Sequence, residues 1–582
     1  MLFAFLSCGL GSSNAEKLQL EMLPQFEGKP ILVSSGGLTD GEGRSISITR
    51  LDYLLSGLQL QTQEGEWYAL GDWYAYFSLG EGRTSVSVKP VPFGKFVAAR
   101  FHIGVPPQVN ASDPNQYPDL HPLNPQVNGL HWGWQGGYVF CAIEGHYTRE
   151  NGTMGGFSYH LAGDNNLMTV TVPIDYDSEK HSRIALVLNL DEVFSGAHRI
   201  DVAQSSSTHS RDGDSTAHEL ARNLESAIAL SEVSSVAFQD AFFPYGSSDP
   251  EIAHRGTPYL ARVTDRFPKV TFPADNPLTE EGVSLGEELF NDVRLSRGNQ
   301  QSCVSCHSPD AAFSDQVALS VGVEGKSGLR NAMPLFNLAW SPSYFWDGRA
   351  PTLREQALMP IEDHLEMNES LDRVVEKLEA DETYPRLFEA AFGSVEITPE
   401  RIGLSLEQFL LAQIAQDSKF DRAVRGDAIF TEQEKRGLEL FVTEYDPQKN
   451  LFGADCFHCH GGNLFTNNRF SNNGLDTDFS DLGRYSVTKD IADLGKFKVP
   501  SLRNIALTAP YMHDGRFATL EEVVDHYSEG VKPSSTLDPN LAKHPPEGIR
   551  LSKEDKKALV AFLETLTEIS LIKDPSPTLA EN

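Results

Sequence analysis

The chain has 582 residues, 40% of them hydrophobic, which is long enough for several domains with ordinary buried cores. Its 81 acidic residues outnumber its 48 Lys and Arg residues, and the formal charge of −33 argues against nucleic acid or an anionic membrane as a partner. No stretch after the first residues approaches ~18 consecutive apolar residues, so we expect no transmembrane helix.

The chain begins with a short apolar segment that resembles the end of a signal peptide but lacks a basic region. We therefore expect residues 1–16 to be a leader and the protein to be exported to the periplasm. Leu6-Ser7-Cys8 loosely resembles a lipoprotein cleavage box, so Cys8 is a candidate for a lipid anchor. Ser13-Asn14-Ala15 resembles an ordinary cleavage site and is the alternative.

The region 17–231 is predicted to form a β domain. Apolar and polar residues alternate in 84–91, 167–172 and 184–190, and clusters of Gly, Pro, Asn and Asp separate these segments. This pattern is typical of an antiparallel β-sandwich. A helix is expected near the end of the domain, where apolar residues recur at helical spacing: Ala217, Leu220, Ala221, Leu224 and Ile228. The following region 232–275 lacks a strong period and is predicted to be a linker.

The region from 276 onward is predicted to be mainly helical. Two pentapeptides of the form Cys-x-x-Cys-His, at 303–307 and 456–460, are typical of c-type haem attachment. Two cysteines hold the porphyrin edge through thioethers, and the next residue places an imidazole at the iron. We therefore expect two covalent haem c groups, bound by Cys303, Cys306, His307, Cys456, Cys459 and His460.

An internal repeat accompanies the two motifs. Leu-Arg-Asn at 329–331 and Asp-Gly-Arg at 347–349 follow the first motif, and the same tripeptides recur at 502–504 and 514–516. Duplication of one cytochrome c-like unit is the simplest explanation. We expect a first haem domain at 276–420, a second at 421–570 and a tail at 571–582.

The haem half resembles the bacterial dihaem cytochrome c peroxidase/MauG superfamily over residues 276–570. The resemblance rests on both haem motifs, Ala312-Phe313-Ser314-Asp315, Phe345-Trp346-Asp347-Gly348-Arg349 and Ala509-Pro510-Tyr511-Met512-His513-Asp514-Gly515. It implies an enzyme that reacts with hydrogen peroxide through a high-valent dihaem state. Many such peroxidases place a histidine in the loop before Leu-Arg-Asn, where it closes the peroxide haem. Here Val323 occupies that position, so the first haem should be open.

The same resemblance implies roles for further residues. Glu366 matches a distal glutamate that moves protons, while Gln356 and Pro360 match its neighbours in the pocket. Trp346 matches a tryptophan that relays electrons between the haems. Asn331, Thr508 and Pro510 match positions that hold a calcium ion.

The second haem requires a ligand on its other face, and the register of the family assigns Tyr527 to this position. A phenolate there resembles MauG and its relative MbnH, whereas the peroxidases commonly use methionine. His526 and Met512 are the alternatives within the chain. Tyrosine favours ferric and higher iron states, which suits storage of an oxidising equivalent better than electron relay.

The amino-terminal half resembles the MbnP family of periplasmic copper-binding proteins over residues 17–230. The similar segments include 104–106, 121–124, 131–138, 157–161 and 208–214. In that family a tryptophan is oxidised to kynurenine and helps histidines bind copper. The copper ligands expected here are His121, His131 and His160, with His209 as a further candidate. Trp134 is slightly preferred over Trp132 as the modified residue.

Three hypotheses follow. In the first, the haem half uses hydrogen peroxide to oxidise a tryptophan in its own or a neighbouring MbnP-like domain. In the second, it is a cytochrome c peroxidase that takes electrons from a small redox protein. In the third, it is chiefly a copper-binding or copper-delivery protein, whose haems serve only its maturation.

Overall fold

The structure is a computed structural model that describes residues 16–33, 36–118, 120–132, 136–211, 213–235, 256–261, 263–270 and 272–568. Cys8, Trp134 and the tail at 571–582 lie outside the described residues. Contacts divide the chain into two compact units. The first unit comprises residues 1–112, 137–148 and 158–242, and the second comprises residues 113–136, 149–157 and 243–582. Each unit is described by itself.

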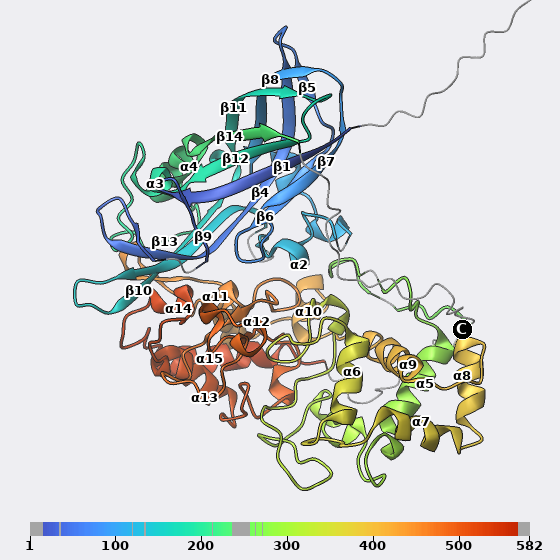
Figure 1. The fold of residues 1–582 in the computed structure, drawn as a ribbon. Coiled ribbons are helices and arrows are strands. Elements are labelled where there is room, and N and C mark those ends of the chain that lie inside the picture. Colours follow the sequence, from blue (N-terminus) through green and yellow to red (C-terminus); the bar gives the residue numbers. More distant parts are fainter. Residues whose placement is uncertain are drawn as a thin grey trace, which may run out of the picture. The chain divides into compact units, whose positions relative to one another are not determined.

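The β-rich region contains two sheets (Figure 1). The smaller sheet has the order β14-β12-β1-β2, with β7 also paired to β1. Its strands are β1 (Glu16–Phe26), β2 (Lys29–Pro30), β7 (Ser85–Val91), β12 (Arg183–Asn189) and β14 (Ile228–Ser234). The larger sheet has the order β11-β8-β4-β9-β10-β13, and β3, β5 and β6 pair with β4. Its strands are β3 (Leu38–Thr39), β4 (Ser45–Thr62), β5 (Trp67–Ala69), β6 (Tyr74–Ser78), β8 (Lys95–Ile103), β9 (Val139–Thr148), β10 (Met154–Ala162), β11 (Met168–Asp177) and β13 (Ser207–Thr208).

The alternation that predicted these strands reflects burial of one face. In β11 every second residue from Met168 to Tyr176 is buried and the intervening residues are exposed, as expected for a strand with one covered face. Most pairings are antiparallel, as the sandwich prediction requires, but β1 runs parallel to β12 and β10 runs parallel to β13. Alternation does not distinguish these two arrangements, because it reports only which face is buried.

Short helices also occur in the first unit: α1 (Pro107–Asn110), α3 (Leu190–Ser195) and α4 (Ser215–Ser226). Helix α2 (Pro125–Asn128) belongs to the second unit. The helix expected near the end of the domain is α4, and the Asp214 carboxylate accepts a hydrogen bond from the Ala217 N–H at its start. Ile228, which we assigned to this helix by spacing, instead begins β14. That strand continues to Ser234, beyond the boundary predicted at 231.

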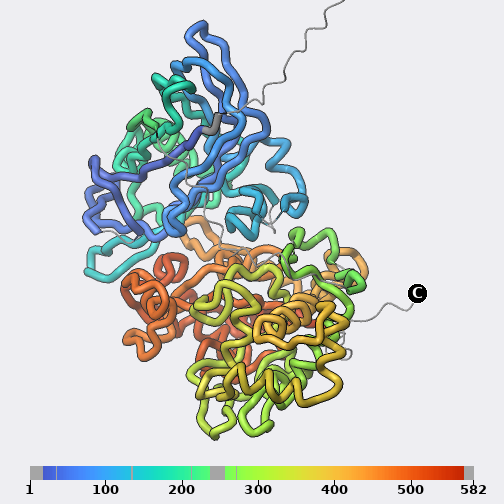
Figure 2. Tube along the Cα trace, turned by 45° about the vertical axis from the view of Figure 1, so that its right-hand side comes forward, coloured from blue at the N-terminus to red at the C-terminus, as the bar shows by residue number. Residues whose placement is uncertain are grey.

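The rest of the second unit is mainly helical, as predicted. Its helices are α5 (Glu280–Asn291), α6 (Leu353–Glu362), α7 (Leu371–Glu379), α8 (Tyr384–Phe392), α9 (Pro399–Leu411), α10 (Lys419–Arg425), α11 (Glu432–Phe441), α12 (Tyr485–Thr488), α13 (Leu520–Asp525), α14 (Pro539–Ala542) and α15 (Lys553–Glu564). Two small hairpin-like pairs join β15 (Tyr445–Asp446) to β16 (Leu451–Phe452) and β17 (Phe470–Ser471) to β18 (Phe497–Lys498). In Figure 2, as in Figure 1, the segments drawn from green to yellow and from orange to red lie side by side.

The internal repeat is visible in the helix packing. Helix α5 packs against α9 in the first half, and α11 packs against α15 in the second. Both contacts are close because a glycine stands at the crossing. A Cβ atom on Gly286 would lie 2.1 Å from the Ser405 carbonyl oxygen, and one on Gly437 would lie 2.0 Å from that of Ala558. Each haem motif therefore follows a helix that is fixed to its own half in the same way.

None of the helices within the described ranges is long and apolar enough to cross a membrane, as expected from the sequence.

Candidate functional site

The first haem motif is a short 3₁₀ turn, Cys303–Ser305, that follows α5. The His307 N–H donates to the Cys303 carbonyl at 2.9 Å, which closes the turn. The His307 Nδ1 lies 2.9 Å from the Phe313 carbonyl oxygen, so Nδ1 carries the proton and Nε2 is left to bind a metal. Burial lowers the pKa of His307, which favours the neutral imidazole that ligates iron.

The second motif repeats this geometry. Cys456–His458 forms a 3₁₀ turn, and the His460 Nδ1 lies 3.1 Å from the Phe465 carbonyl oxygen. Burial lowers the pKa of His460 to about 4. No disulfide joins the four cysteines of the two motifs. Both motifs thus fit haem c: each presents two thiols for the porphyrin edge and a neutral, oriented imidazole for the iron.

The loop that carries Val323 is attached directly to the segment that carries Glu366. The Val323 N–H donates to the Glu366 carbonyl at 2.9 Å. The preceding Gly322 permits this approach, since a Cβ there would lie 2.1 Å from the Leu365 carbonyl oxygen. The structure therefore brings together the two residues that the sequence assigned to the open face of the first haem.

Glu366 has the electrostatic character of a proton carrier. Burial raises the pKa of its carboxyl group, the charge of Asp363 raises it further, and Arg349 acts in the opposite direction. In turn, the Glu366 carboxylate contributes to the raised pKa values of the Cys303 and Cys306 thiols, for which burial is the main cause. Glu366 thus lies close to the point where the first haem would be attached.

Helix α6 supplies the other residues predicted for this pocket. Gln356 lies in its middle and Pro360 one turn later, inside the helix. The Pro360 carbonyl accepts a hydrogen bond from the Met367 N–H at 3.2 Å, which folds the segment containing Glu366 back against the end of the helix. This contact brings the segment that carries Glu366 back toward the helix that carries Gln356 and Pro360.

Tyr527 lies in a π-helical turn, His526–Gly530, that continues α13. Such turns are uncommon and often mark functional positions. Burial raises the pKa of the Tyr527 phenol well above its usual 10, the Asn473 amide lowers it, and the charges of Cys459 and Cys456 raise it again. The phenol is therefore buried close to the second pair of haem-binding cysteines.

The two alternative ligands for the second haem, His526 and Met512, both contact Asn473. His526 Nε2 lies 2.9 Å from the Asn473 carbonyl oxygen, which can only accept, so this nitrogen carries a proton. Met512 Sδ lies 3.3 Å from Asn473 Nδ2, and the same Nδ2 lies 3.4 Å from the Tyr527 hydroxyl. Asn473 is a residue that our sequence reasoning missed, because an asparagine in a loop carries no signal of its own.

Trp346 connects the two halves of the second unit. Its indole Nε1–H donates to the Asn331 carbonyl at 2.9 Å, and its own carbonyl accepts from the Lys498 N–H at 2.7 Å. Asn331 follows the first haem motif, whereas Lys498 lies just before the second Leu-Arg-Asn tripeptide. Burial lowers the pKa of the Lys498 amine to about 7. The tryptophan predicted as a relay is thus held at the junction of the halves.

The residues predicted to hold calcium are also near this junction. The Asn331 N–H donates to the His513 carbonyl at 2.8 Å, and its side-chain Nδ2 donates to the Val317 and Ala318 carbonyls. The Thr508 hydroxyl donates to the Ile505 carbonyl, and Pro510 follows a cis peptide bond. The hydrogen bond to His513 links Asn331 to the segment that contains Thr508 and Pro510, and carbonyl and hydroxyl oxygens are the atom types that calcium binds.

The candidate copper ligands fall into both units. His160 and His209 belong to the first unit. Their rings form an edge-to-face pair with 5.0 Å between the ring centroids. His160 Nε2 lies 2.9 Å from a Glu144 carboxylate oxygen, and Arg50 pairs with the same carboxylate at 2.7 Å. This buried group places His209, which the sequence ranked last, beside His160.

His121 and His131 belong to the second unit, within residues 113–136. His121 Nδ1 accepts a hydrogen bond from the Leu123 N–H at 3.1 Å, so this nitrogen carries no proton. Burial lowers the pKa of His131 to about 4. Trp132 is buried, and Trp134 lies outside the described residues.

A buried ionic group next to the second haem motif was not predicted. Glu444, Asp455 and His458 present ligand-type atoms within 4.8 Å of one another. However, the Lys543 ammonium lies 3.0 Å from the Glu444 carboxylate and 3.2 Å from that of Asp455. A lysine therefore already balances these carboxylates, and the group is better explained as structure than as a metal site.

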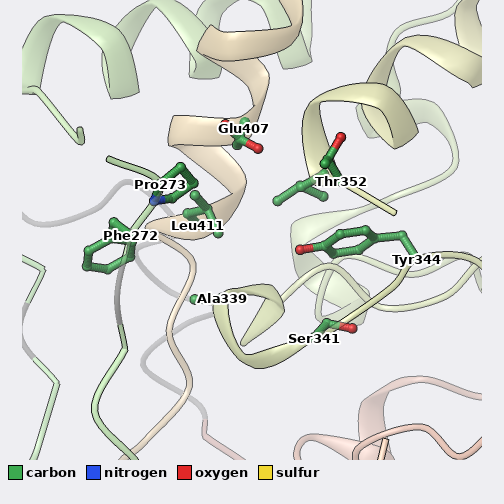
Figure 3. Close-up of a pocket in the computed structure, with 9 residues that line it drawn as sticks. Phe272, Pro273, Ala339, Ser341, Tyr344, Thr352, Glu407 and Leu411 are labelled. Atoms are coloured by element: carbon green, nitrogen blue, oxygen red, sulfur yellow. The ribbon is translucent and has the colours of Figure 1, made fainter. Parts of the chain in front are cut away.

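A small cavity of about 30 Å³ lies in the first half, between α9 and the loop before α6 (Figure 3). Its lining includes Ser341, Tyr344, Thr352, Glu407 and Leu411. This volume suits one or two water molecules. Its lining includes none of the residues assigned to either haem.

Comparisons with known proteins agree with this description. A family model described as di-haem cytochrome c peroxidase matches residues 280–429, and one described as MbnP matches residues 15–210. The methylamine utilization protein MauG of Methylorubrum extorquens is 38% identical over 314 residues, which cover 53% of this chain and 85% of the relative. The cytochrome c551 peroxidase of Nitrosomonas europaea is 34% identical over 304 residues, covering 50% and 82%.

A solved structure is also similar. The crystal structure of a MauG-like protein associated with microbial copper homeostasis has 36% sequence identity and a TM-score of 0.50. The match covers 55% of this chain and 98% of that protein.

Proposed function

Because this chain belongs to the di-haem cytochrome c peroxidase/MauG family and carries an N-terminal MbnP domain, we propose that it uses hydrogen peroxide to oxidise a tryptophan of an MbnP domain to kynurenine. The family makes the chain a peroxidase-class enzyme with two haem c groups. The observation that carries the proposal is the occurrence of both parts on one chain. The target domain is its own or that of a neighbouring molecule, and the site of action is the periplasm.

The residues of the first site have complementary roles in this proposal. When bound to His307, the haem supplies the iron at which the peroxide O–O bond is cleaved. Glu366 would accept the proton of the attacking peroxide oxygen and return it to the oxygen that leaves, and the upward shift of its pKa, caused mainly by burial, favours holding that proton in between. Val323 offers no metal-binding atom, so this face stays open to peroxide. Gln356 and Pro360 shape the same pocket.

The second site and the junction complete the proposal. Together with His460, Tyr527 would hold the second haem, and a phenolate ligand would favour oxidised states of the iron. Trp346 carries electrons between the halves. Calcium at Asn331, Thr508 and Pro510 holds the halves together.

Oxidation of the tryptophan is proposed to prepare a copper site. Trp134 is the preferred target, and Trp132 is the second candidate. The candidate copper ligands are His121, His131 and His160, with His209 as a further candidate, because imidazole nitrogen suits this metal. A relative whose structure is associated by name with copper homeostasis supports this part of the proposal.

Mass spectrometry of the peptides that contain Trp132 and Trp134 tests the function. The haem-loaded full chain is treated with peroxide, and an untreated sample and a Glu366→Gln sample serve as controls. We expect the mass increase of kynurenine at one tryptophan only in the treated wild-type protein. Unmodified tryptophan after complete peroxide consumption would refute the proposal.

A second candidate function is peroxide reduction with electrons from a small cytochrome, and relatives named as cytochrome c peroxidases favour it. The two functions differ in their electron source. Sustained oxidation of reduced cytochrome c, without tryptophan modification, would identify a peroxidase. Copper binding after a single oxidation event, with negligible turnover, would instead identify a copper-binding or delivery protein.

A further inference from the structure

Asn473 contacts all three side chains that are candidates for the open position of the second haem. Its Nδ2 lies 3.4 Å from the Tyr527 hydroxyl oxygen and 3.3 Å from Met512 Sδ. Its backbone carbonyl oxygen lies 2.9 Å from His526 Nε2 and accepts a hydrogen bond from the N–H at that nitrogen. One residue thus faces the oxygen, sulfur and nitrogen atoms among which the second haem must obtain its ligand.

The backbone on both sides of Asn473 is fixed. The Asn472 Nδ2 donates to the Ser534 and Thr536 hydroxyl oxygens, both at 2.9 Å. The Gly474 N–H donates to the Asn472 Oδ1 at 2.9 Å. Gly474 has a φ of +71°, and a Cβ on it would lie 2.6 Å from the Val531 side chain. The backbone that carries the Asn473 side chain is therefore fixed by contacts of its two neighbours.

The three contacts are chemically unequal. An amide N–H bonds weakly to a thioether sulfur but strongly to an anionic oxygen, because the second bond is charge-assisted. The carbonyl of Asn473 meanwhile keeps the proton on His526 Nε2, which removes that nitrogen from competition for a metal. These contacts therefore favour the Tyr527 phenolate over the Met512 sulfur and the His526 nitrogen as the ligand of the second haem.

We propose that Asn473 is a positioning residue that donates a hydrogen bond to the Tyr527 phenolate when this oxygen binds the iron of the second haem. The inference rests on the ligand role proposed above for Tyr527. The N–H withdraws electron density from the phenolate oxygen, so the oxygen donates less to the iron. Asn473 thereby raises the reduction potential of the second haem above that of an unsupported tyrosinate haem.

The test compares the haem-loaded Met512→Leu protein with the Met512→Leu, Asn473→Leu double variant. Removing the thioether first ensures that methionine cannot replace the tyrosine when the amide is lost. We expect the double variant to favour the ferric state about tenfold more, which lowers the midpoint potential of the second haem by about 59 mV. Iron–phenolate vibrations measured by resonance Raman spectroscopy should shift in parallel.

Two controls separate the outcomes. Asn473→Ala in the same background repeats the loss of the donor with a smaller side chain, in case leucine does not fit. The spin state of the first haem should be unchanged in every folded variant. A midpoint potential and phenolate vibrations equal to those of Met512→Leu would overturn the inference.

A Tyr527→Phe variant tests the underlying ligand assignment independently. If Tyr527 binds the iron, its removal abolishes the phenolate vibrations and changes the spectrum of the second haem. If Tyr527→Phe leaves that spectrum unaltered, the ligand assignment fails, and the inference about Asn473 is overturned with it. A changed spectrum in Tyr527→Phe combined with no effect of Asn473→Leu would overturn the inference alone.

Discussion

The two haem-binding halves share one framework and differ on the face opposite the histidine. In both, a glycine allows close packing of the helix before the motif, and a backbone carbonyl orients the histidine. Opposite His307 the chain is proposed to place Val323 and Glu366, and opposite His460 it is proposed to place Tyr527 with Asn473. The repeated framework orients the histidine of each haem motif in the same way, and under the proposal the residues outside the repeat give the two haems different chemistry.

The largest expected difference concerns the reaction with peroxide. Glu366→Gln keeps the shape of the side chain but removes its ability to exchange a proton, so the rate of reaction with peroxide should fall about 10²–10⁴-fold. Stopped-flow absorbance of the haem band measures this rate. The matched control is Glu362→Gln, because Glu362 is exposed at the end of α6 and should react as the wild type does. An equal loss in both variants would contradict a specific role for Glu366.

The second expected difference concerns stability and the arginines of the two Leu-Arg-Asn tripeptides, Arg330 and Arg503. Arg503 is 1% exposed and pairs with Asp421 through two hydrogen bonds of 2.8 and 2.9 Å. Its counterpart Arg330 is partly exposed and pairs with Asp481. Asp421→Asn leaves a buried guanidinium without its charge partner and should lower the free energy of unfolding by about 3–5 kcal/mol. Asp481→Asn should lower it by about 1 kcal/mol.

The loss of stability caused by Asp421→Asn should depend on pH. Burial alone would raise the pKa of Asp421, but the hydrogen bond and charge of Arg503 hold it below its usual value. Its stabilisation is therefore complete above the unfolded-state pKa of about 3.9 and is lost as the pH falls through the lower folded-state value. Denaturant unfolding of the holoprotein at several pH values should show the difference between Asp421→Asn and wild type shrinking in acid. A constant difference would contradict this origin.

The third difference concerns access to the first haem. Val323→His introduces an imidazole into a loop whose backbone is hydrogen-bonded to Glu366. In many dihaem peroxidases a histidine at this position closes the peroxide haem, so the first haem of the variant should become six-coordinate. The variant should then react with peroxide at least about tenfold more slowly until this haem is reduced. Electronic spectra of the resting protein measure the coordination. Val323→Leu is the control and should remain open.

Much of this arrangement could be predicted from the sequence, and particular residues show why. The haem motifs, the capped helices before them and the alternation in β11 are local patterns, since the residues involved are neighbours in the chain. At the start of α5, for example, the Thr279 hydroxyl accepts a hydrogen bond from the Gly282 N–H, only three residues along the chain. The glutamate at 366 and the tyrosine at 527 required family register, because nothing local distinguishes them from surface residues.

Other features could not be predicted, because they depend on contacts between distant parts of the chain. The parallel pairing of β1 with β12 joins strands more than a hundred residues apart. Asn473 meets Met512 and Tyr527 only in the folded protein. Likewise, the two arginines of the repeat have identical tripeptide contexts, yet one is buried and the other is partly exposed. Burial of this kind is set by packing and leaves no mark on the tripeptide.

The smallest expected effect sharpens the assignment of the second haem. His526 and Tyr527 are adjacent, and only one of them can be the ligand at this position. Because His526 Nε2 donates to the Asn473 carbonyl at 2.9 Å, His526→Gln can replace that hydrogen bond with its own amide N–H. The spectrum and midpoint potential of the second haem should then change less than about twofold in the ferric–ferrous equilibrium, or about 18 mV. Electron paramagnetic resonance of the ferric protein would detect a lost histidine ligand directly. If the low-spin signal disappears in His526→Gln and persists in Tyr527→Phe, then His526 is the ligand. Both protein ligands of the second haem would then be imidazoles, and the proposed role of Tyr527 would fail.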